Sequence, residues 1–173
     1  MSTRSTRANS APAGQEQVHK LGITQLLGIR LTSIAKSKVE GEMQIGDAHM
    51  NRNRKVNGGA IMTLGDIMGA AGTIANLAPG CRTSTIESKT NFFAGGEGPV
   101  IKAVSIPLHI GRTTMVWQTT VRNLDGRMVA IVTQTQIVMA APPDAKPTAA
   151  AAKRASKPAK RTGAHARTRE RTA

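Results

Sequence analysis

The chain carries an aspartate, Asp66, in the middle of its most apolar helical stretch, which runs from Asn57 to Leu77. Aspartate is a poor residue for a helix interior, and burying its charge among Ile, Leu and Met side chains costs free energy unless something compensates. A carboxylate held in such a place can act as a general base or as a nucleophile. The alternative is a buried carboxylate that accepts hydrogen bonds from Thr or backbone donors and does no chemistry.

Cysteine and histidine give weaker signals. The single cysteine, Cys81, excludes an intrachain disulfide framework, and no His or Asn pattern accompanies it to activate its thiol. None of the four histidines forms a spaced ligand set with it or with paired carboxylates, so no metal site is expected. His109, close to Gly111, fits the end of a strand better than a catalytic base.

Around Asp66 the apolar pattern predicts two helices and six strands. The long helix begins after Asn57, a plausible N-cap, and stops before Pro79-Gly80. A short helix is expected over 18–27 and a basic, polar loop over 46–56. The strands are expected over 29–35, 39–45, 84–93, 100–110, 115–122 and 128–139.

The order of these elements predicts an α+β fold. Apolar residues of one parity run from Val100 to Ile110 and are interrupted only by Lys102, which favours an extended strand over a helix. The segment 123–126, Asn-Leu-Asp-Gly, supplies hairpin turn chemistry between the last two strands. Two strands, one long helix and a meander of four strands are therefore expected, with the helix buried against the concave face of one curved antiparallel sheet.

Length and composition set the organisation of the chain. Its 173 residues suit one domain with tails. We expect a disordered N-terminal segment over 1–16, a folded domain over 17–140, and a disordered tail rich in Ala, Pro and Lys over 141–173. No run resembles a secretory signal or a membrane span, so a soluble, cytoplasmic protein is expected.

The net charge of +14 lies largely in the tail. Residues 141–173 hold nine Lys and Arg against two acids, a net charge of +7, and residues 17–140 contribute only +6. Such a tail is attracted to nucleic acid or to another polyanion by counterion release. The alternative is a solubilising appendage with no partner.

The motif Asn51-(five residues)-Asn57-Gly58-Gly59-(six residues)-Asp66 resembles the PaaI-like acyl-CoA thioesterases of the hotdog superfamily. Weaker likenesses follow in His109-Ile-Gly-Arg112 and in the segment 125–130. The resemblance covers about residues 21–140 and implies a hotdog fold, in which a central helix is wrapped by a curved sheet. It also implies a homodimer or tetramer, with active sites formed across the dimer interface.

The resemblance assigns a role to each motif residue. Asp66 is then the general base or nucleophile, and the backbone N–H of Gly58 forms the oxyanion hole with support from the positive end of the helix dipole. Asn51 matches a side chain that holds the thioester or the water. Ser84, with its neighbours Thr83 and Thr85, falls where a hydroxyl group helps to place that water.

The residue before the glycine pair departs from the family pattern. Many members carry His there, whereas this chain has Asn57, which can donate a hydrogen bond to a carbonyl but cannot change its protonation state. The alternative role for Asn57 is a simple helix cap. The phosphates of coenzyme A also need a basic rim, for which the candidates are Arg82, Lys89, Arg112 and Arg127.

The function expected from these residues is hydrolysis of an acyl- or aryl-CoA thioester to a free acid and coenzyme A. No separate cofactor is expected, because coenzyme A is part of the substrate. A rival is a non-catalytic hotdog protein that binds acyl-CoA and is tethered to a polyanion by its tail. A dehydratase or hydratase on the same fold ranks lower, since the His and Asp pairing on one helix is missing.

Overall fold

The computed structural model describes residues 22–140 of the chain, so the predicted segments 1–16 and 141–173, together with residues 17–21, lie outside it. None of the helices in the described range is long and apolar enough to span a membrane. The elements are α2 (Gly22–Leu26), β1 (Ile29–Ala35), β2 (Lys38–Gln44), the 3-10 helix η1 (Asp47–His49), α3 (Gly58–Asn76), β3 (Arg82–Phe92), β4 (Val100–Ile110), β5 (Thr114–Asn123) and β6 (Met128–Met139).

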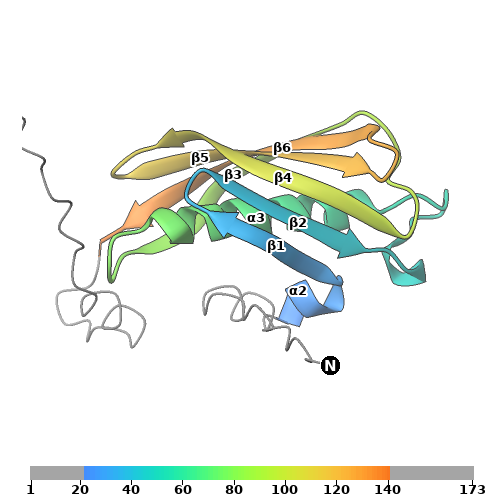
Figure 1. The fold of residues 1–173 in the computed structure, drawn as a ribbon, viewed down its shortest axis with the longest axis horizontal. Coiled ribbons are helices and arrows are strands. Elements are labelled where there is room, and N and C mark those ends of the chain that lie inside the picture. The colour runs from blue at the N-terminus through green and yellow to red at the C-terminus, as the bar shows by residue number, and fades with distance from the viewer. Residues whose placement is uncertain (1–21, 141–173) are drawn as a thin grey trace, which may run out of the picture.

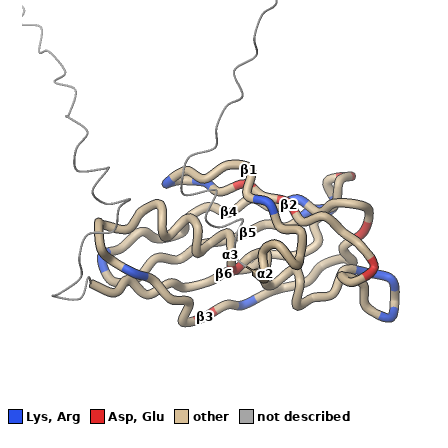
Figure 2. The backbone as a smooth tube through the Cα atoms, turned by 90° about the horizontal axis from the view of Figure 1, so that it is seen from below, with Lys and Arg blue, Asp and Glu red and all other residues tan. Residues whose placement is uncertain are grey.

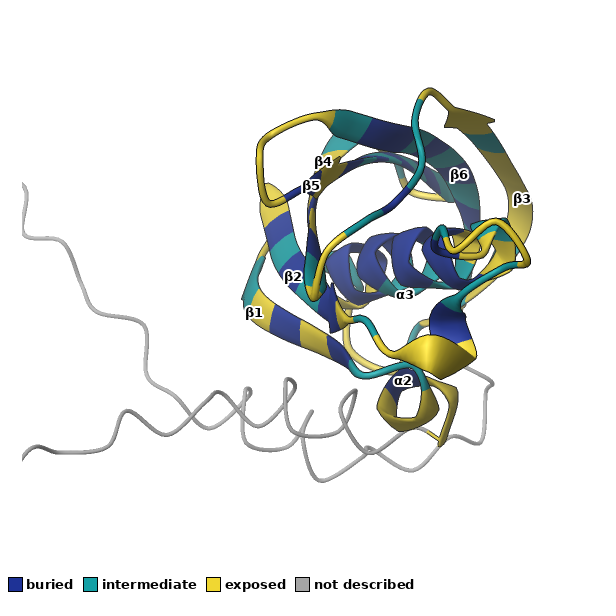
Figure 3. Ribbon diagram, turned by 90° about the vertical axis from the view of Figure 1, so that its right-hand side faces the viewer, coloured by how far each residue is buried: buried dark blue, intermediate teal, exposed yellow. Residues whose placement is uncertain are grey.

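One curved sheet wraps around the long helix α3 (Figure 1). The strand order is β1-β2-β4-β5-β6-β3, and every neighbouring pair is antiparallel. Seen along the helix, α3 lies inside the curve of the sheet, and its buried residues face the strands (Figure 3). The predicted α+β architecture, one helix on the concave face of one antiparallel sheet, is confirmed.

The predicted meander of four consecutive strands is wrong in one strand. β4, β5 and β6 are consecutive neighbours, but β3 pairs with β6, and β4 pairs with β2. Because α3 crosses the concave face, the chain leaves the helix beside the edge of the sheet farthest from β1. β3 forms that edge, and residues 93–99 then return the chain to the middle of the sheet.

The predicted element boundaries agree closely with those of the structure. β1, β4 and β6 have the predicted ends, and α3 begins after Asn57, whose side chain caps it. The helix ends at Asn76, a few residues before the Pro79-Gly80 stop signal. Gly126, at φ +87°, completes the predicted turn between β5 and β6, and its N–H donates to the Asn123 carbonyl at 3.0 Å.

Close contact between α3 and the sheet depends on glycine. Gly65, Gly69 and Gly72 lie three or four residues apart, so they share one face of the helix. A Cβ atom on any of the three would overlap a side chain of the sheet. The side chains at these contacts are Val132, Gln134 and Trp117. The helix axis is therefore held close to β5 and β6, which offsets the roughly 1 kcal/mol of helix propensity that each glycine costs.

The apolar parity of β4 faces away from the helix up to Ile106, and the register shift between Pro107 and His109 then places Ile110 opposite the buried Met115. Val104, Ile106, Leu108 and Ile110 are between 40% and 55% exposed, whereas Ile101, Ala103 and Ser105 are buried. The extended conformation predicted from this pattern is confirmed. Val104 and Ile106, however, form an apolar stripe on the outer surface of the sheet, and exposed apolar surface of this kind marks interaction sites.

Replacing Gly72 by alanine tests the helix contact. A Cβ at this position would lie 2.5 Å from Cη2 of Trp117, which is fully buried, so the added methyl group overpacks the core. We expect Gly72→Ala to lower the free energy of unfolding by about 1–3 kcal/mol, measured from denaturant midpoints. Helix propensity alone predicts the opposite, a gain of about 1 kcal/mol. Gly22→Ala is the matched control, since nothing lies within 4 Å of a Cβ there.

Candidate active site

The first turn of α3 leaves one backbone donor open. Oδ1 of Asn57 accepts a hydrogen bond from the Gly59 N–H at 2.8 Å. The Asn57 carbonyl accepts from the N–H groups of Ala60 and Ile61 at 3.1 and 3.3 Å. Gly58 N–H donates to no acceptor within residues 22–140. Asn57 thus acts as the helix cap, and the N–H of Gly58 points out of the positive end of the helix without a partner.

Gly58 is bordered by the aromatic ring of Phe92 from the end of β3. A Cβ atom on residue 58 would lie 3.1 Å from Cζ of this ring, which is tighter than ordinary packing. Phe92 itself is 50% exposed. The open N–H therefore has an apolar neighbour, and apolar surroundings strengthen a hydrogen bond to a developing negative charge.

Asp66 is half-buried and is bound through one carboxylate oxygen. The hydroxyl of Thr85 on β3 donates to Oδ1 of Asp66 at 2.8 Å. Nε2 of Gln134 donates to the backbone carbonyl of Asp66 at 3.1 Å. Within residues 22–140, Oδ2 of Asp66 accepts no hydrogen bond. The Thr partner of the non-catalytic alternative is present, yet it satisfies only one of the two oxygens.

Behind Thr85 lies a short chain of polar side chains on the inner face of β3 and β6. Nε2 of Gln136 donates to Oγ1 of Thr85 at 2.7 Å. The Thr83 hydroxyl lies 3.0 Å from Oε1 of Gln136 and 2.9 Å from the Ile137 carbonyl. Asp66 is thus connected through Thr85 and Gln136 to Thr83, two residues before Thr85 on β3.

Ser84 lies on the other face of the sheet from Asp66. Side chains alternate along a strand, and Ser84, exposed and opposite Ile137, points outward, while Thr83 and Thr85 point inward. The hydroxyl that reaches Asp66 within one chain is therefore that of Thr85, which the sequence named only as a neighbour. Gln136 was missed altogether, although two glutamines of one parity, 134 and 136, interrupt the apolar pattern of β6.

Asn51 lies in the loop before α3, where its side chain shapes the loop. Its Oδ1 accepts from the N–H groups of Asn53 and Lys55 at 2.9 and 3.2 Å. A pair of bridge residues, Met50 and Val56, closes the loop. Nδ2 of Asn51 donates to no group in the described part of the chain, so two N–H donors remain for a ligand.

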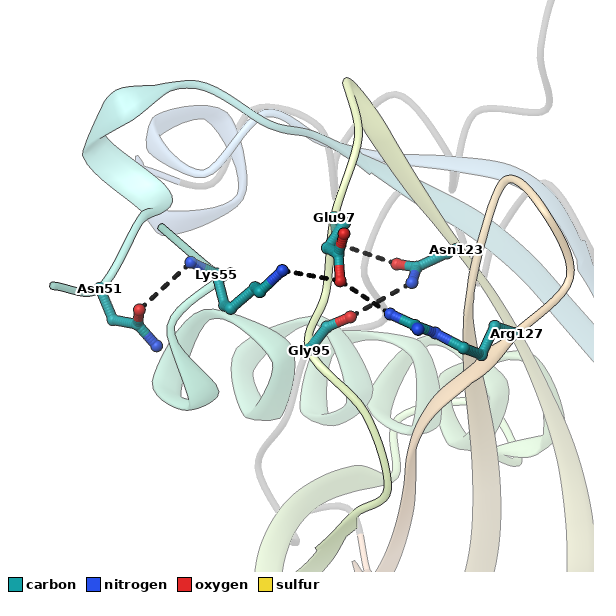
Figure 4. A network of polar contacts seen from close by, with 6 residues as sticks. All are labelled: Asn51, Lys55, Gly95, Glu97, Asn123 and Arg127. Carbon is teal, nitrogen blue, oxygen red and sulfur yellow. Dashed lines mark hydrogen bonds and ion pairs between the residues drawn. The ribbon is translucent and has the colours of Figure 1, made fainter. Parts of the chain in front are cut away.

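A charge cluster ties this loop to the hairpin between β5 and β6 (Figure 4). Oε1 of Glu97 lies 2.8 Å from Nζ of Lys55 and 2.7 Å from the guanidinium of Arg127. Asn123 accepts from the Glu97 N–H at 2.9 Å and donates to the Gly95 carbonyl at 3.2 Å. The hydrogen bond and charge of Lys55, followed by Arg127, lower the pKa of Glu97. Of the predicted coenzyme A rim, Arg127 is thus engaged with a carboxylate.

The other three basic candidates do not gather around Arg127 within one chain. Arg82, opposite Met139, and Arg112, in the turn between β4 and β5, lie at the end of the sheet away from the start of α3. Lys89 is exposed on the outer face of β3, opposite Thr133. The Lys and Arg residues of residues 22–140 accordingly spread over both ends of the molecule (Figure 2).

The two main motif residues are too far apart to act together within one chain. Gly58 and Asp66 lie eight residues apart on one helix, which at 1.5 Å per residue is about 12 Å along its axis. An oxyanion donor must lie about 3 Å from the carbonyl oxygen it stabilises. Across residues 22–140, no group of three or more His, Cys, Asp and Glu side chains is arranged to hold a metal ion.

Comparison with known proteins finds a family model that matches the part of the chain that carries these residues. The family model of the thioesterase superfamily matches residues 53–130, which include the open N–H of Gly58, Asp66 and Thr85. The 1,4-dihydroxy-2-naphthoyl-CoA hydrolase of Listeria monocytogenes serotype 1/2a (strain 10403S) is 20% identical over 111 residues, which are 64% of this chain and 90% of that relative.

Solved structures share the fold. A thioesterase family protein from Silicibacter pomeroyi superposes with a TM-score of 0.69 at 22% identity, covering 73% of this chain and 96% of that chain. A protein described as a hypothetical thioesterase, from Streptococcus pneumoniae TIGR4 and solved with coenzyme A, gives 0.65 at 23% identity, with 73% and 98% covered. The sheet order and the central helix agree with these structures, so the chain has the hotdog fold, and its residues 53–130 match the thioesterase superfamily.

Proposed function

We propose that the protein hydrolyses an acyl- or aryl-CoA thioester to a free acid and coenzyme A, as a PaaI-like thioesterase. The observation that carries this proposal is the half-bound carboxylate of Asp66, whose Oδ1 is held by Thr85 while Oδ2 accepts no hydrogen bond in the described range. A carboxylate with one oxygen fixed and one open suits a base or nucleophile.

The chemistry needs only this carboxylate, a donor and water. As a base, Asp66 takes a proton from water while the water oxygen bonds to the thioester carbon. The carbonyl oxygen becomes negative, and the N–H of Gly58 stabilises it. The C–S bond then breaks, and the thiolate of coenzyme A recovers the proton from Asp66. As a nucleophile, Asp66 instead bonds to the thioester carbon, and the C–S bond breaks to give an anhydride and the thiolate of coenzyme A. Water then hydrolyses the anhydride to the free acid and the Asp66 carboxylate, and the thiolate takes the proton that this water releases.

The site requires two chains. The roughly 12 Å along the helix between Gly58 and Asp66 is too long for one thioester carbonyl to contact both in a single chain. β3 is an edge strand of eleven residues that carries exposed apolar side chains, Ile86 and Phe92, and Phe93 follows it. An exposed edge of this kind favours pairing with another strand. We infer a homodimer joined along β3, with Asp66 from one chain facing Gly58 from the other.

The ligand chemistry follows from the relatives. The Streptococcus pneumoniae structure contains coenzyme A, and the Listeria relative is named for an aryl-CoA substrate. Pairing of two chains brings basic residues of the second chain to each site, which supports a divided rim of Arg82, Lys89, Arg112 and Arg127 for the phosphates. The outer apolar stripe of β4 supports further pairing of dimers into a tetramer.

Replacing Asp66 by asparagine tests the proposal directly. Asparagine keeps the shape and an oxygen for Thr85 but cannot take a proton, so kcat should fall by roughly two or more orders of magnitude. Thiol release from a panel of acyl- and aryl-CoA thioesters is the measurement, with circular dichroism and size-exclusion chromatography as controls for folding and assembly. An undiminished rate would remove Asp66 from the mechanism.

Gly58 permits a test of the backbone donor alone. Proline suits the first position of a helix and the extended Asn57 before it, but it lacks an N–H. We expect Gly58→Pro to lower kcat by about 10²–10³-fold, as for loss of an oxyanion donor. Gly58→Ala is the matched control, because it presses on Phe92 in the same way and keeps the N–H.

Mixing the two inactive chains tests the shared site. In a mixed dimer of Asp66→Asn and Gly58→Pro chains, one of the two sites contains both native residues, and the other contains neither. Activity should therefore return to about half of the native value in each mixed dimer if sites form across the interface. Mixed dimers that stay inactive would show instead that each site belongs to one chain.

The basic tail gives the second candidate function its own test. A net charge of +7 over residues 141–173 favours attraction to nucleic acid or another polyanion. Removing these residues should leave kcat unchanged and weaken retention on heparin or DNA columns, with the salt needed for elution falling. Unchanged retention would leave the tail as a solubilising appendage. Loss of thioester hydrolysis would show instead that the folded, active enzyme needs the tail.

A further inference from the structure

We propose that Gln136 is a positioning residue of the active site, which acts on Asp66 through the hydroxyl of Thr85. The inference rests on the proposed function and names the group that decides which oxygen of Asp66 reacts. Gln136 is 1% exposed and lies on the inner face of β6. Burying an amide without hydrogen bonds is costly, and an apolar side chain would fill this place with no need for partners.

The proton of the Thr85 hydroxyl has only one direction consistent with an ionised Asp66. Oγ1 of Thr85 lies 2.7 Å from Nε2 of Gln136 and 2.8 Å from Oδ1 of Asp66. An amide nitrogen only donates, so Oγ1 must accept there, and its single proton goes to Asp66. Gln136 thereby makes Thr85 a dedicated donor to the carboxylate.

Rotating the Gln136 amide by half a turn breaks this arrangement. Its oxygen would then face Oγ1 of Thr85, and one proton cannot serve both this oxygen and the Asp66 carboxylate. The Thr83 hydroxyl has one proton and two acceptors, Oε1 of Gln136 at 3.0 Å and the Ile137 carbonyl at 2.9 Å, and donation to Oε1 favours the unrotated amide. In the orientation that the structure shows, the donors run from Gln136 to Thr85 to Asp66.

The consequence for catalysis is a choice between the two carboxylate oxygens. A donated hydrogen bond withdraws charge from Oδ1 and fixes the rotation of the carboxylate about its bond to Cβ. Oδ2 is left as the oxygen that meets the water or the thioester carbon. Thr85 holds Asp66 in this orientation, and Gln136 keeps Thr85 from turning its proton elsewhere.

Gln134 provides a matched control two residues away on the same strand. It is also 1% exposed and faces the helix. Its Nε2, however, donates to the backbone carbonyl of Asp66 at 3.1 Å and not to Thr85. Gln134→Met and Gln136→Met both remove a buried amide and keep the side-chain length. Loss of stability is expected in both variants, so Gln134→Met serves as the control for stability, and loss of kcat through Thr85 is expected in Gln136→Met.

The experiment measures kcat and KM separately for the single and double variants of the full-length protein. Thr85→Val should lower kcat by about tenfold to a hundredfold with KM nearly unchanged, as for loss of a hydrogen bond to a charged group. Thr85→Ser should restore most of this loss. Gln136→Met should lower kcat by a smaller factor, and Thr85→Val with Gln136→Met should match Thr85→Val alone, because Gln136 acts through Thr85.

Two results would overturn the inference while the proposed function stands, provided that Asp66→Asn is inactive. The first is a native kcat in a folded Gln136→Met variant. The second is a double variant whose loss of kcat equals the product of the two single losses. If Gln136→Met does not fold, Gln136→Glu takes its place. Its carboxylate draws the Thr85 proton away from Asp66, so a native kcat there is equally contrary. An Asp66→Asn variant as active as the native enzyme would instead remove the proposed function itself.

Discussion

The close approach of α3 to the sheet is the constraint on which the rest of the structure depends. Gly65, Gly69 and Gly72 bring the helix axis within contact of the β5 and β6 side chains, so the helix cannot shift or rotate without a clash. Cores packed at this density transmit small displacements, and they do not absorb them. Because the helix axis is fixed, the positions of Gly58 at its start and Asp66 two turns later are fixed as well.

This contact also explains why Asp66 has the environment it has. The glycine face of α3 meets β5 and β6, and position 66 lies beside that face, turned toward β3 at the edge of the sheet. Within one chain, β3 has no neighbouring strand on its outer side, so the carboxylate is half-buried and not enclosed. A partly open carboxylate keeps its charge at moderate cost while one oxygen stays accessible. Packing and chemistry thus use adjacent faces of one helix.

The sequence predicted the elements far better than their order in space. Asn57 marked the helix start, and the alternation over β4 and the turn at Gly126 marked strands, because these signals depend on neighbouring residues. The place of β3 beside β6 depends on how the chain crosses the helix, which no local pattern contains. The same limit explains Ser84 and Thr85: residues 83–85 all carry hydroxyl groups, and only the pairing of β3 decides which of them face the helix.

The cap at the start of α3 leaves one open donor, and the length of the helix between that donor and Asp66 is the reason for the proposed two-chain site. The side-chain oxygen of Asn57 accepts from the Gly59 N–H, and its carbonyl accepts from the N–H groups of Ala60 and Ile61. The single open donor at the helix start is therefore the N–H of Gly58. A histidine is not required to create that donor, since the cap alone leaves it unpaired. The rigid helix that presents it, however, holds Asp66 about 12 Å away. In the proposed mechanism, an open donor and an open carboxylate at that separation form a thioester site when a second copy of the chain brings its Asp66 to the donor of the first.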